Sequence, residues 1–192
     1  MSTAVESQMS NMHVHLCKAD LEYLLNGDKF INRSPLGILG EWVSDIRVDV
    51  YHPTKVYQFK HNVIVLGSDV TRPISQIETD YGDATYLFKD RTIPTADTLP
   101  ENAPKYTLRC GRREILVPIF IPTDHIHISV EFKDRVALHD GKVCVYYPSG
   151  KSEYLFAKFN EIDRPKTIAG LIHKNKASYF TTENEGIVIN TF

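Results

Sequence analysis

The sequence has no apolar run that approaches the roughly 20 residues needed to span a bilayer, so no transmembrane helix is expected. Its opening segment, MSTAVESQMSN, lacks the basic start and apolar centre of a secretory signal. The three cysteines, Cys17, Cys110 and Cys144, are odd in number and show no C-x-x-C spacing, which argues against a disulfide framework. These absences predict a cytoplasmic protein, in a cell or in an infected host cell.

A strong net charge is also missing. The 22 Lys and Arg residues nearly balance the 24 Asp and Glu residues, so no global field draws the molecule onto nucleic acid or an anionic membrane. No Gly-rich phosphate loop joins a strand to a helix, and no G-x-S-x-G elbow occurs, so nucleotide hydrolysis and Ser-His-Asp chemistry have no support. Any contact with an anionic partner must therefore be local, and no membrane partner is expected.

What the sequence does contain is a long series of short alternating segments, separated by turn residues at intervals of roughly 8 to 12 residues. The period changes once, where Leu21, Leu24 and Leu25 recur at helical spacing before an Asn26-Gly27 stop. This pattern predicts a mainly β fold, an antiparallel β-barrel or sandwich with one N-terminal helix at about residues 18–26. Too few helices are present for the crossovers of a parallel α/β fold.

Several individual elements are predicted from local signals. The strongest strand signal lies in residues 114–132, where ILVPIFIP and HIHISVEF flank a Pro-Thr-Asp turn, and we interpret the segment as a core hairpin. ISQIE and ATYLF are interpreted as strands joined by a turn at residues 80–83. Asp140-Gly141 is a strong two-residue hairpin signal.

The predicted organisation is a flexible arm followed by one domain. Residues 1–11 are small and polar, which is typical of a flexible arm, and residues 12–192 form a single β-rich domain. Residues 90–104 carry three prolines and no periodicity, so they are either a surface crossover or a boundary between sub-domains. We favour the crossover.

The first candidate is a metal-binding site. Strand alternation places His125, His127 and Glu131 on one face, and imidazole and carboxylate are metal ligands. The order H-x-H-x-x-x-E resembles the first metal motif of cupins, and this resemblance implies a β-barrel enzyme that holds Fe, Mn, Ni or Zn. The upstream glycine of that motif is absent, and Glu153 stands where the histidine of the second cupin motif is expected. A solvated polar strand face is the simpler interpretation.

A second H-x-H, formed by His13 and His15, lies near the start of the chain. His127-Ile128-Ser129 also matches one half of the paired H-x-[ST] signature of two-histidine phosphoesterases. The other half is missing, because His13-Val14-His15 has no hydroxyl at the required position. The sequence does not establish whether the two H-x-H strands are neighbours.

The second candidate site is a nucleic-acid interface. The order of strand MHVHLC, helix ADLEYLL and turn NGDK resembles the opening of ASCH and related PUA-like domains over residues 12–34. The resemblance implies RNA or modified-base binding by Lys29, beside Gly27 in the turn, and by Arg33. Asn32 stands where a glutamate is usual, and Arg33 arrives one residue early. The simpler interpretation is two solvated charges on an edge strand.

A basic cluster with an interleaved tyrosine supports the same hypothesis. Its cations are Lys105, Arg109, Arg112 and Arg113. Such clusters provide phosphate pairing and base stacking for single-stranded nucleic acid, although most are simply solvated. The leading prediction is thus a non-enzymatic, cofactor-free, PUA-like protein that contacts RNA or single-stranded nucleic acid through Lys29, Arg33 and this cluster. The alternatives are a structural or assembly protein, viral in origin, that self-associates or binds protein partners, and a metal-dependent cupin-like enzyme.

Overall fold

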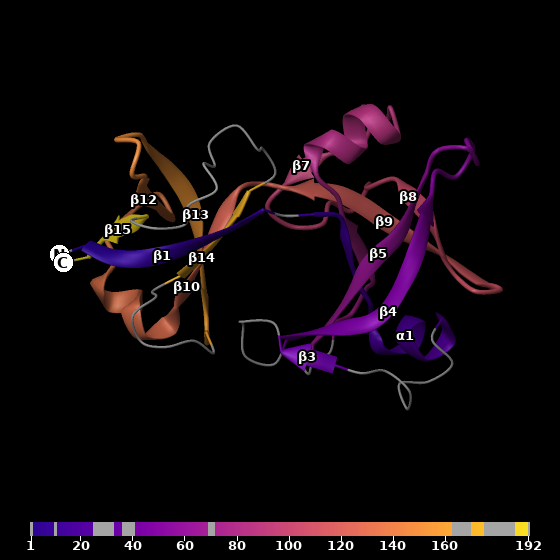
Figure 1. The fold of residues 1–192 in the computed structure, drawn as a ribbon, viewed down its shortest axis with the longest axis horizontal. Helices are drawn as coiled ribbons and strands as arrows, with labels where there is room; N and C mark the ends of the chain where they lie inside the picture. The colour runs from indigo at the N-terminus through magenta and orange to yellow at the C-terminus, as the bar shows by residue number, and fades with distance from the viewer. Residues whose placement is uncertain are drawn as a thin grey trace. The chain divides into compact units, whose positions relative to one another are not determined.

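The chain forms two compact units in the computed structural model, which describes residues 2–9, 11–24, 33–35, 41–68, 72–162, 170–174 and 187–191. The central unit holds the described residues from Asn11 to Thr123. The terminal unit holds β1 (Ser2–Met9) and the described residues from Asp124 onward (Figure 1). The chain passes from one unit to the other between Thr123 and Asp124, so segment 90–104 lies inside the central unit.

The central unit is a closed six-stranded barrel. Its pairings run from β4 to β5, β2, β6, β9 and β8 and return to β4. The short strands β3 and β7 pair with β4 and β9 respectively. The strands of this unit are β2 (His13–His15), β3 (Arg33–Pro35), β4 (Glu41–Tyr51), β5 (Phe59–Ser68), β6 (Gln76–Glu78), β7 (Thr95–Ala96), β8 (Lys105–Cys110) and β9 (Arg113–Pro122). The prediction of a mainly β barrel is confirmed.

Alternation along these strands sends aliphatic side chains into the barrel. The aliphatic side chains of the barrel strands that are at most 2% exposed are Val14, Val48, Val50, Val63, Val65, Ile77, Leu108, Val117 and Ile119. The helix α1 (Lys18–Leu24) packs Leu21 and Leu24 into the same core, as the period of 3.6 residues predicts. Among the described helices, none is long and apolar enough to cross a membrane.

One predicted strand of the central unit is helical instead. Residues Asp83–Leu87 form the short π-helix η2 rather than a strand. The carboxylate of Asp80 accepts the Asp83 N–H at 2.8 Å, and the Asp80 carbonyl accepts the Ala84 N–H at 3.1 Å. Satisfying the first free amides of a helix in this way stabilises it locally, so the Asp-Tyr-Gly-Asp segment begins a helix instead of closing a hairpin.

The pairings of the terminal unit also close a ring of six strands, in the order β10, β13, β12, β15, β1 and β14. Its elements are β1, β10 (His125–Ser129), the 3-10 helix η3 (Val130–Arg135), β11 (Leu138–His139), β12 (Lys142–Tyr146), β13 (Ser152–Asn160), β14 (Gly170–Lys174) and β15 (Val188–Asn190). Asp140 and Gly141, at φ 51° and 74°, turn β11 into β12, which confirms the predicted hairpin.

The two rings share one topology. From β2 in the central unit the pairings around the ring are parallel, antiparallel three times, parallel and antiparallel. From β10 in the terminal unit the same series recurs. The two H-x-H strands therefore occupy equivalent positions. The position of β9 is filled by β1, so residues 2–9, predicted as a flexible arm, form a ring strand paired along both edges.

The predicted core hairpin at residues 114–132 does not form. Its two strands exist as β9 and β10, but β9 pairs with β8, β6 and β7, and β10 pairs with β13 and β14. Both edges of each strand are thus occupied by other partners. The Pro122-Thr123-Asp124 segment is the connection between the units rather than a hairpin turn.

A close packing contact in the central unit gives a testable consequence for stability. Gly67 of β5 is the register partner of Trp42 in β4, and a Cβ at position 67 would fall inside the indole ring. We expect Gly67→Ala to lower the free energy of unfolding by about 3 kcal/mol, because the ring cannot move without disrupting the core. Urea unfolding followed by circular dichroism measures this loss. Adding Trp42→Leu to Gly67→Ala should then cost less than the two single changes summed, and simple additivity would exclude the contact as the cause.

Candidate functional site

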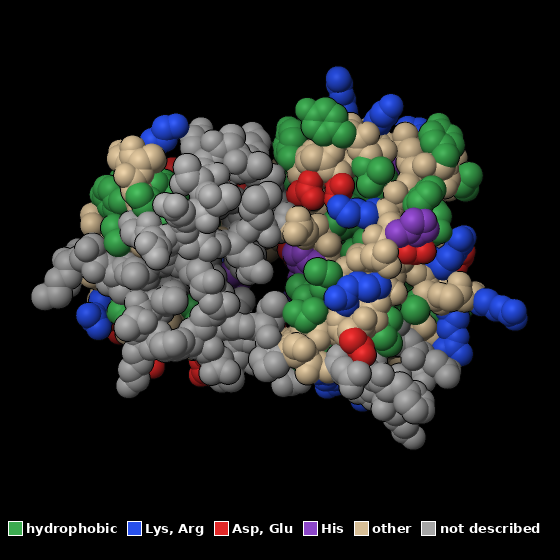
Figure 2. Space-filling model, viewed as in Figure 1, with side chains coloured by type: hydrophobic (Ala, Val, Ile, Leu, Met, Phe, Trp, Pro, Cys, Tyr) green, Lys and Arg blue, Asp and Glu red, His purple; other side chains and the backbone are tan. Residues whose placement is uncertain are grey.

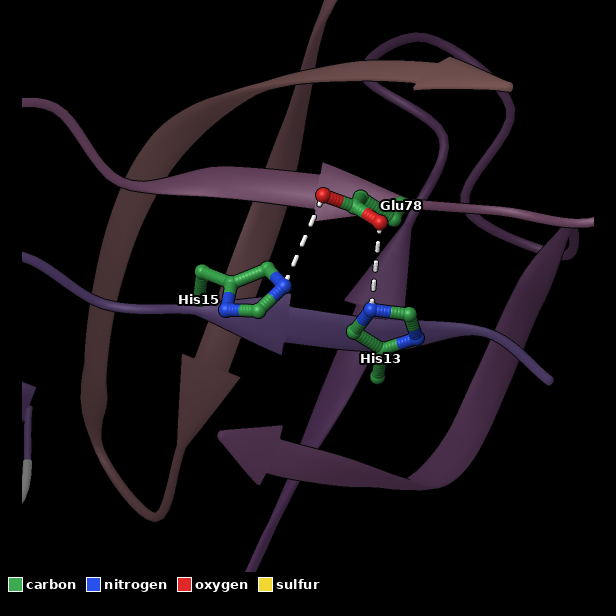
Figure 3. Close-up of side chains that lie close together, drawn as sticks. All are labelled: His13, His15 and Glu78. Carbon is green, nitrogen blue, oxygen red and sulfur yellow. Dashed lines mark ion pairs between the residues drawn. The ribbon is translucent and has the colours of Figure 1, made fainter. Parts of the chain in front are cut away.

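His13, His15 and Glu78 form a compact cluster in the central unit (Figure 3). The Nε2 atom of His13 lies 3.2 Å from Oε2 of Glu78, and Nε2 of His15 lies 3.5 Å from Oε1 of the same carboxylate. One ligand atom of each residue lies within 4.8 Å of those of the other two. The two imidazoles meet edge to face, with ring centroids 5.0 Å apart.

The pairing of β2 with β6 creates this cluster. These strands are antiparallel, with His13 opposite Glu78 and His15 opposite Gln76. Because side chains alternate along a strand, Val14 and Ile77 fill the barrel core while both histidines and Glu78 lie on the other face. The side chains of His13, His15 and Glu78 are nevertheless only 14%, 8% and 16% exposed. The cluster is therefore shielded from bulk solvent.

Neighbouring groups fix the ligand atoms in place. The Nδ1–H of His13 donates to the Asn11 carbonyl at 2.8 Å, which leaves the Nε2 lone pair directed at the site. The Gln76 amide donates to Oε1 of Glu78 at 2.7 Å and orients the carboxylate. Burial lowers the pKa of His13, but the hydrogen bond and charge of Glu78 outweigh burial, and the net result is a raised pKa.

Ser75 connects the segments around this cluster. Its hydroxyl donates to the Asp20 carboxylate at 2.6 Å and accepts the Cys17 N–H at 2.9 Å. The first contact reaches the first turn of α1, the second reaches Cys17 between β2 and α1, and Ser75 itself immediately precedes β6. These contacts hold the histidine-bearing and glutamate-bearing strands in a fixed relation.

The donor set fits a divalent metal ion. With bonds of about 2.05 Å, donors around a tetrahedral zinc ion lie about 3.3 Å apart, and each histidine Nε2 lies at a comparable distance, 3.2 or 3.5 Å, from one of the two oxygens of Glu78. Two imidazoles and one carboxylate occupy three positions of such an ion and leave the fourth open. Open coordination of this kind is typical of catalytic rather than structural zinc.

An arginine–glutamate pair borders the cluster. Nη2 of Arg72 lies 3.3 Å from Oε1 of Glu41, and the charge of Glu41 acts on both His13 and Glu78. Burial is the main reason why the pKa of Glu41 is raised, Arg72 opposes that shift and Glu78 adds to it. The Arg72 Nε atom is buried, and no hydrogen-bond partner for it is found in the described part of the chain. Arg72 thus brings a partly shielded cation to the edge of the cluster.

The predicted metal ligands His125 and His127 lie on β10 of the terminal unit. Their Nε2 atoms are 3.1 Å apart, and Nδ1 of His127 lies 2.5 Å from Oδ1 of Asn160. Glu131, the third predicted ligand, is not on the strand but in η3, where it is exposed. The strand ends at Ser129, so the alternation that placed Glu131 with the histidines stops before reaching it.

Backbone register identifies the position of the terminal unit that corresponds to Glu78 of the central unit. In the central unit, Glu78 is the register partner of His13, the first histidine of the H-x-H. In the terminal unit, the register partner of His125 is His173. The two rings share their topology, so His173 occupies the position equivalent to Glu78. The two H-x-H strands belong to different sheets and do not pair with each other.

Of the residues predicted to bind nucleic acid, the three arginines Arg33, Arg109 and Arg113 have contacts within the chain. Arg33 stacks over the Trp42 ring, 4.3 Å from its centroid. Arg109 pairs with Glu114 and lies over Tyr51, and the Arg113 guanidinium donates to the Tyr23 carbonyl. Lys105 and Arg112 are exposed, and Lys29 lies outside the described residues. On the face drawn in Figure 2, the described cations are dispersed among acidic and apolar side chains.

Sequence reasoning missed Glu78 and Arg72. Glu78 is 63 residues beyond His15 and joins it only through the β2–β6 pairing, which no local pattern reveals. The one available signal was that Gln76 and Glu78 alternate with a buried isoleucine, which predicts two polar side chains on one strand face. Arg72 lies in the loop before β6 and carries no pattern of its own.

Comparison with known families decides between the hypotheses. The family model of phosphate propanoyltransferase matches residues 6–162, which is more than half of the 192 residues. A search of curated proteins found no match. The family match contradicts the PUA-like and cupin resemblances, because it covers the residues on which both depended. It also contradicts a non-enzymatic RNA-binding role, and it gives no support to a viral assembly protein. The chain belongs to the phosphate propanoyltransferase family.

Proposed function

We propose that this chain is a metal-dependent acyltransferase that moves a propanoyl group between a thioester and inorganic phosphate. The family supplies the acyl group and the acceptor. The class of donor follows from chemistry, because the product is an acyl phosphate, a mixed anhydride, and a thioester has a comparable tendency to transfer its acyl group. The observation that carries the proposal is the cluster of His13, His15 and Glu78, together with Arg72, which pairs with Glu41 next to this cluster.

The proposed reaction is a single displacement at the acyl carbon. An oxygen of hydrogen phosphate attacks the thioester carbonyl, a C–O bond forms, and the C–S bond breaks. The departing sulfur takes up the proton released by hydrogen phosphate, so the products are propanoyl phosphate and a free thiol. No oxidation or reduction takes place, and the reaction runs in either direction.

The central cluster supplies the electrophilic side of this chemistry. His13, His15 and Glu78 would hold the ion, and a bound zinc ion would supply Lewis-acid stabilisation of the negative charge that develops on the carbonyl oxygen. The residues themselves set the geometry, because the Asn11 carbonyl and the Gln76 amide hold a histidine and the glutamate in fixed orientations. Shielding of the cluster keeps water from competing with phosphate for the acyl group.

Arg72 is proposed to bind the phosphate. A guanidinium presents a planar fork of N–H donors that matches two phosphate oxygens at once. The buried Nε–H of Arg72 is a donor for which no acceptor is found among the described residues, and Glu41 contacts Nη2 of the guanidinium. Phosphate held at this position lies next to the metal-bearing cluster, which is where the attacking oxygen is needed.

The terminal unit is proposed to hold a second metal ion. His125 and His127 direct their Nε2 atoms toward each other at 3.1 Å, close to the spacing of about 3.3 Å between donors on a tetrahedral zinc ion. Their strand occupies the same position in its ring as β2 does in the central barrel. Glu131 is not part of this proposed site, because it lies beyond the end of the strand, in η3.

The test is a thiol-release assay with propanoyl-coenzyme A and inorganic phosphate. We expect thiol release that requires phosphate, formation of propanoyl phosphate in equal amount, and loss of both after dialysis against a chelator. Adding zinc back should restore the activity, because the ligands remain folded on paired strands.

Controls separate this proposal from simple hydrolysis. Arsenate or sulfate in place of phosphate shows whether the acceptor is specific, and water alone as acceptor would release thiol without phosphate. Thiol release independent of phosphate would contradict the proposed transfer. Full activity in chelated protein with no measurable metal would contradict the role of the cluster.

A further inference from the structure

Asn160 contacts His127, one of the two histidines of the H-x-H pair on β10. It ends β13, which pairs in parallel with β10, and the register places Asn160 beside Ser129, two residues beyond His127. The contact joins Oδ1 of Asn160 and Nδ1 of His127 at 2.5 Å. Both residues are partly buried, so water competes little for the bond.

This contact selects one tautomer of His127. A carboxamide oxygen only accepts hydrogen bonds, so the ring nitrogen facing it must carry the proton. A neutral imidazole carries one proton, and Nε2 of His127 is then left with its lone pair. That Nε2 atom is the one that faces Nε2 of His125.

In the central unit a main-chain oxygen selects the same tautomer of a histidine. There the Asn11 carbonyl accepts the Nδ1–H of His13, and Nε2 of His13 faces Glu78. In the terminal unit a side chain provides the accepting oxygen instead. The same Nδ1 anchor therefore occurs beside both H-x-H pairs, although the oxygen comes from unrelated parts of the chain.

We propose that Asn160 is a positioning residue that holds His127 in the Nδ1–H tautomer, with Nε2 aimed as a ligand, and thereby sets the metal affinity of the terminal unit. This inference rests on the proposed second metal site for its effect on affinity. Its effect on the tautomer does not depend on that site. Removing an outer partner of a metal-binding histidine typically costs 10- to 100-fold in affinity.

The first test is the tautomer itself. The full chain is labelled with ¹⁵N-histidine, stripped of metal and measured by NMR at about pH 8, where free imidazoles are neutral. The His127 signals are assigned by their loss in His127→Ala. We expect the wild-type ring to carry its proton on Nδ1, and Asn160→Leu to shift the ring toward the Nε2–H form. A wild-type ring protonated on Nε2 overturns the proposal without any variant.

The second test is zinc affinity by competition with a chromophoric chelator. We expect Asn160→Leu to weaken the terminal-unit site by about 10- to 100-fold, and Asn160→Asp, which keeps an accepting oxygen, to retain the affinity. Asn190→Leu is the matched control, because Asn190 donates to the Tyr146 hydroxyl on β12, which does not pair with β10. The affinity of the central cluster should not change in any of the three.

The outcomes separate the two proposals. Equal weakening by Asn160→Asp and Asn160→Leu, with the tautomer unchanged, would show that the residue acts through packing alone and would overturn the inference. Absence of a second zinc ion in the wild-type chain would refute the terminal metal site. The tautomer measurement would still decide whether Asn160 positions His127.

Discussion

Replacing His13 and His15 together by alanine is expected to remove the metal ion of the central unit and to lower the rate of acyl transfer by at least about a thousandfold. The expected size follows from the several kcal/mol of charge stabilisation that a Lewis acid provides, since each 1.36 kcal/mol is a factor of ten in rate. Metal content by elemental analysis, on protein purified without a histidine tag, and the thiol-release assay measure the two effects.

The double variant should remain folded. His13 and His15 lie on the face of β2 opposite the core residue Val14, so truncating them leaves no cavity inside the barrel. His61→Ala is the matched control in the same unit, because His61 is exposed and pairs with Asp49 away from the cluster. It should keep both metal and activity.

Metal counts test both sites at once. The wild-type chain is expected to hold about two zinc ions, one in each unit. The His13 and His15 double variant should lose one, and a His125 and His127 double variant should lose the other. A His13 and His15 double variant that retains its full metal content and rate would refute the central cluster as the catalytic site.

The strands that carry the H-x-H pairs could be predicted from the sequence, but the complete cluster of His13, His15 and Glu78 could not. Both H-x-H pairs were recognised by alternation. Within each pair, the two imidazoles share one face of their own strand in the structure. For His125 and His127 a carboxylate partner was sought nearby in sequence and assigned to Glu131, and for His13 and His15 none was identified. In the central unit the carboxylate comes from Glu78 on a neighbouring strand instead, because strand pairing brings distant residues together while periodicity describes only one strand at a time.

The β content and α1 were predictable for similar reasons. Alternation and turn residues are local, and they identified the short strands, the Asp140-Gly141 hairpin and the start of the helix. The division into two rings was not predictable. No local feature shows that β9 and β10 belong to different units, or that residues 2–9 complete the ring of the terminal unit. The repeated topology lies in the pairings, and the two rings show no obvious repeat in sequence.

The basic residues misled the functional prediction because it considered their charges without the groups that contact them in the folded chain. Arg109 and Arg113 lie near a turn, as the sequence indicated, but they contact Glu114 and the Tyr23 carbonyl. Arg72 had no cluster and no motif around it, and it is the arginine that borders the histidine and glutamate ligands. The proposed anion site therefore rests on position relative to the histidine and glutamate cluster rather than on the local density of cations.

Replacing Arg72 by methionine is accordingly expected to lower kcat/KM for phosphate by about a hundredfold, because a bidentate, charge-assisted contact of about 3 kcal/mol is lost. The KM for the thioester should change little, because Arg72 is proposed to contact only the acceptor. Arg72→Lys should recover part of the loss, since it restores charge without the fork. Arg91→Met, a change at an exposed arginine of the same unit, is the control.

Glu41 provides the complementary measurement. Its carboxylate contacts Nη2 of Arg72, so it partly neutralises the cation that is proposed to bind phosphate. Glu41→Gln keeps the shape and removes the charge, and it should lower the KM for phosphate as long as Arg72 is present. In the Arg72→Met background the same change should have little effect, because the guanidinium whose charge Glu41 neutralises is gone. Equal effects of Glu41→Gln in both backgrounds would place phosphate elsewhere and remove Arg72 from the acceptor site.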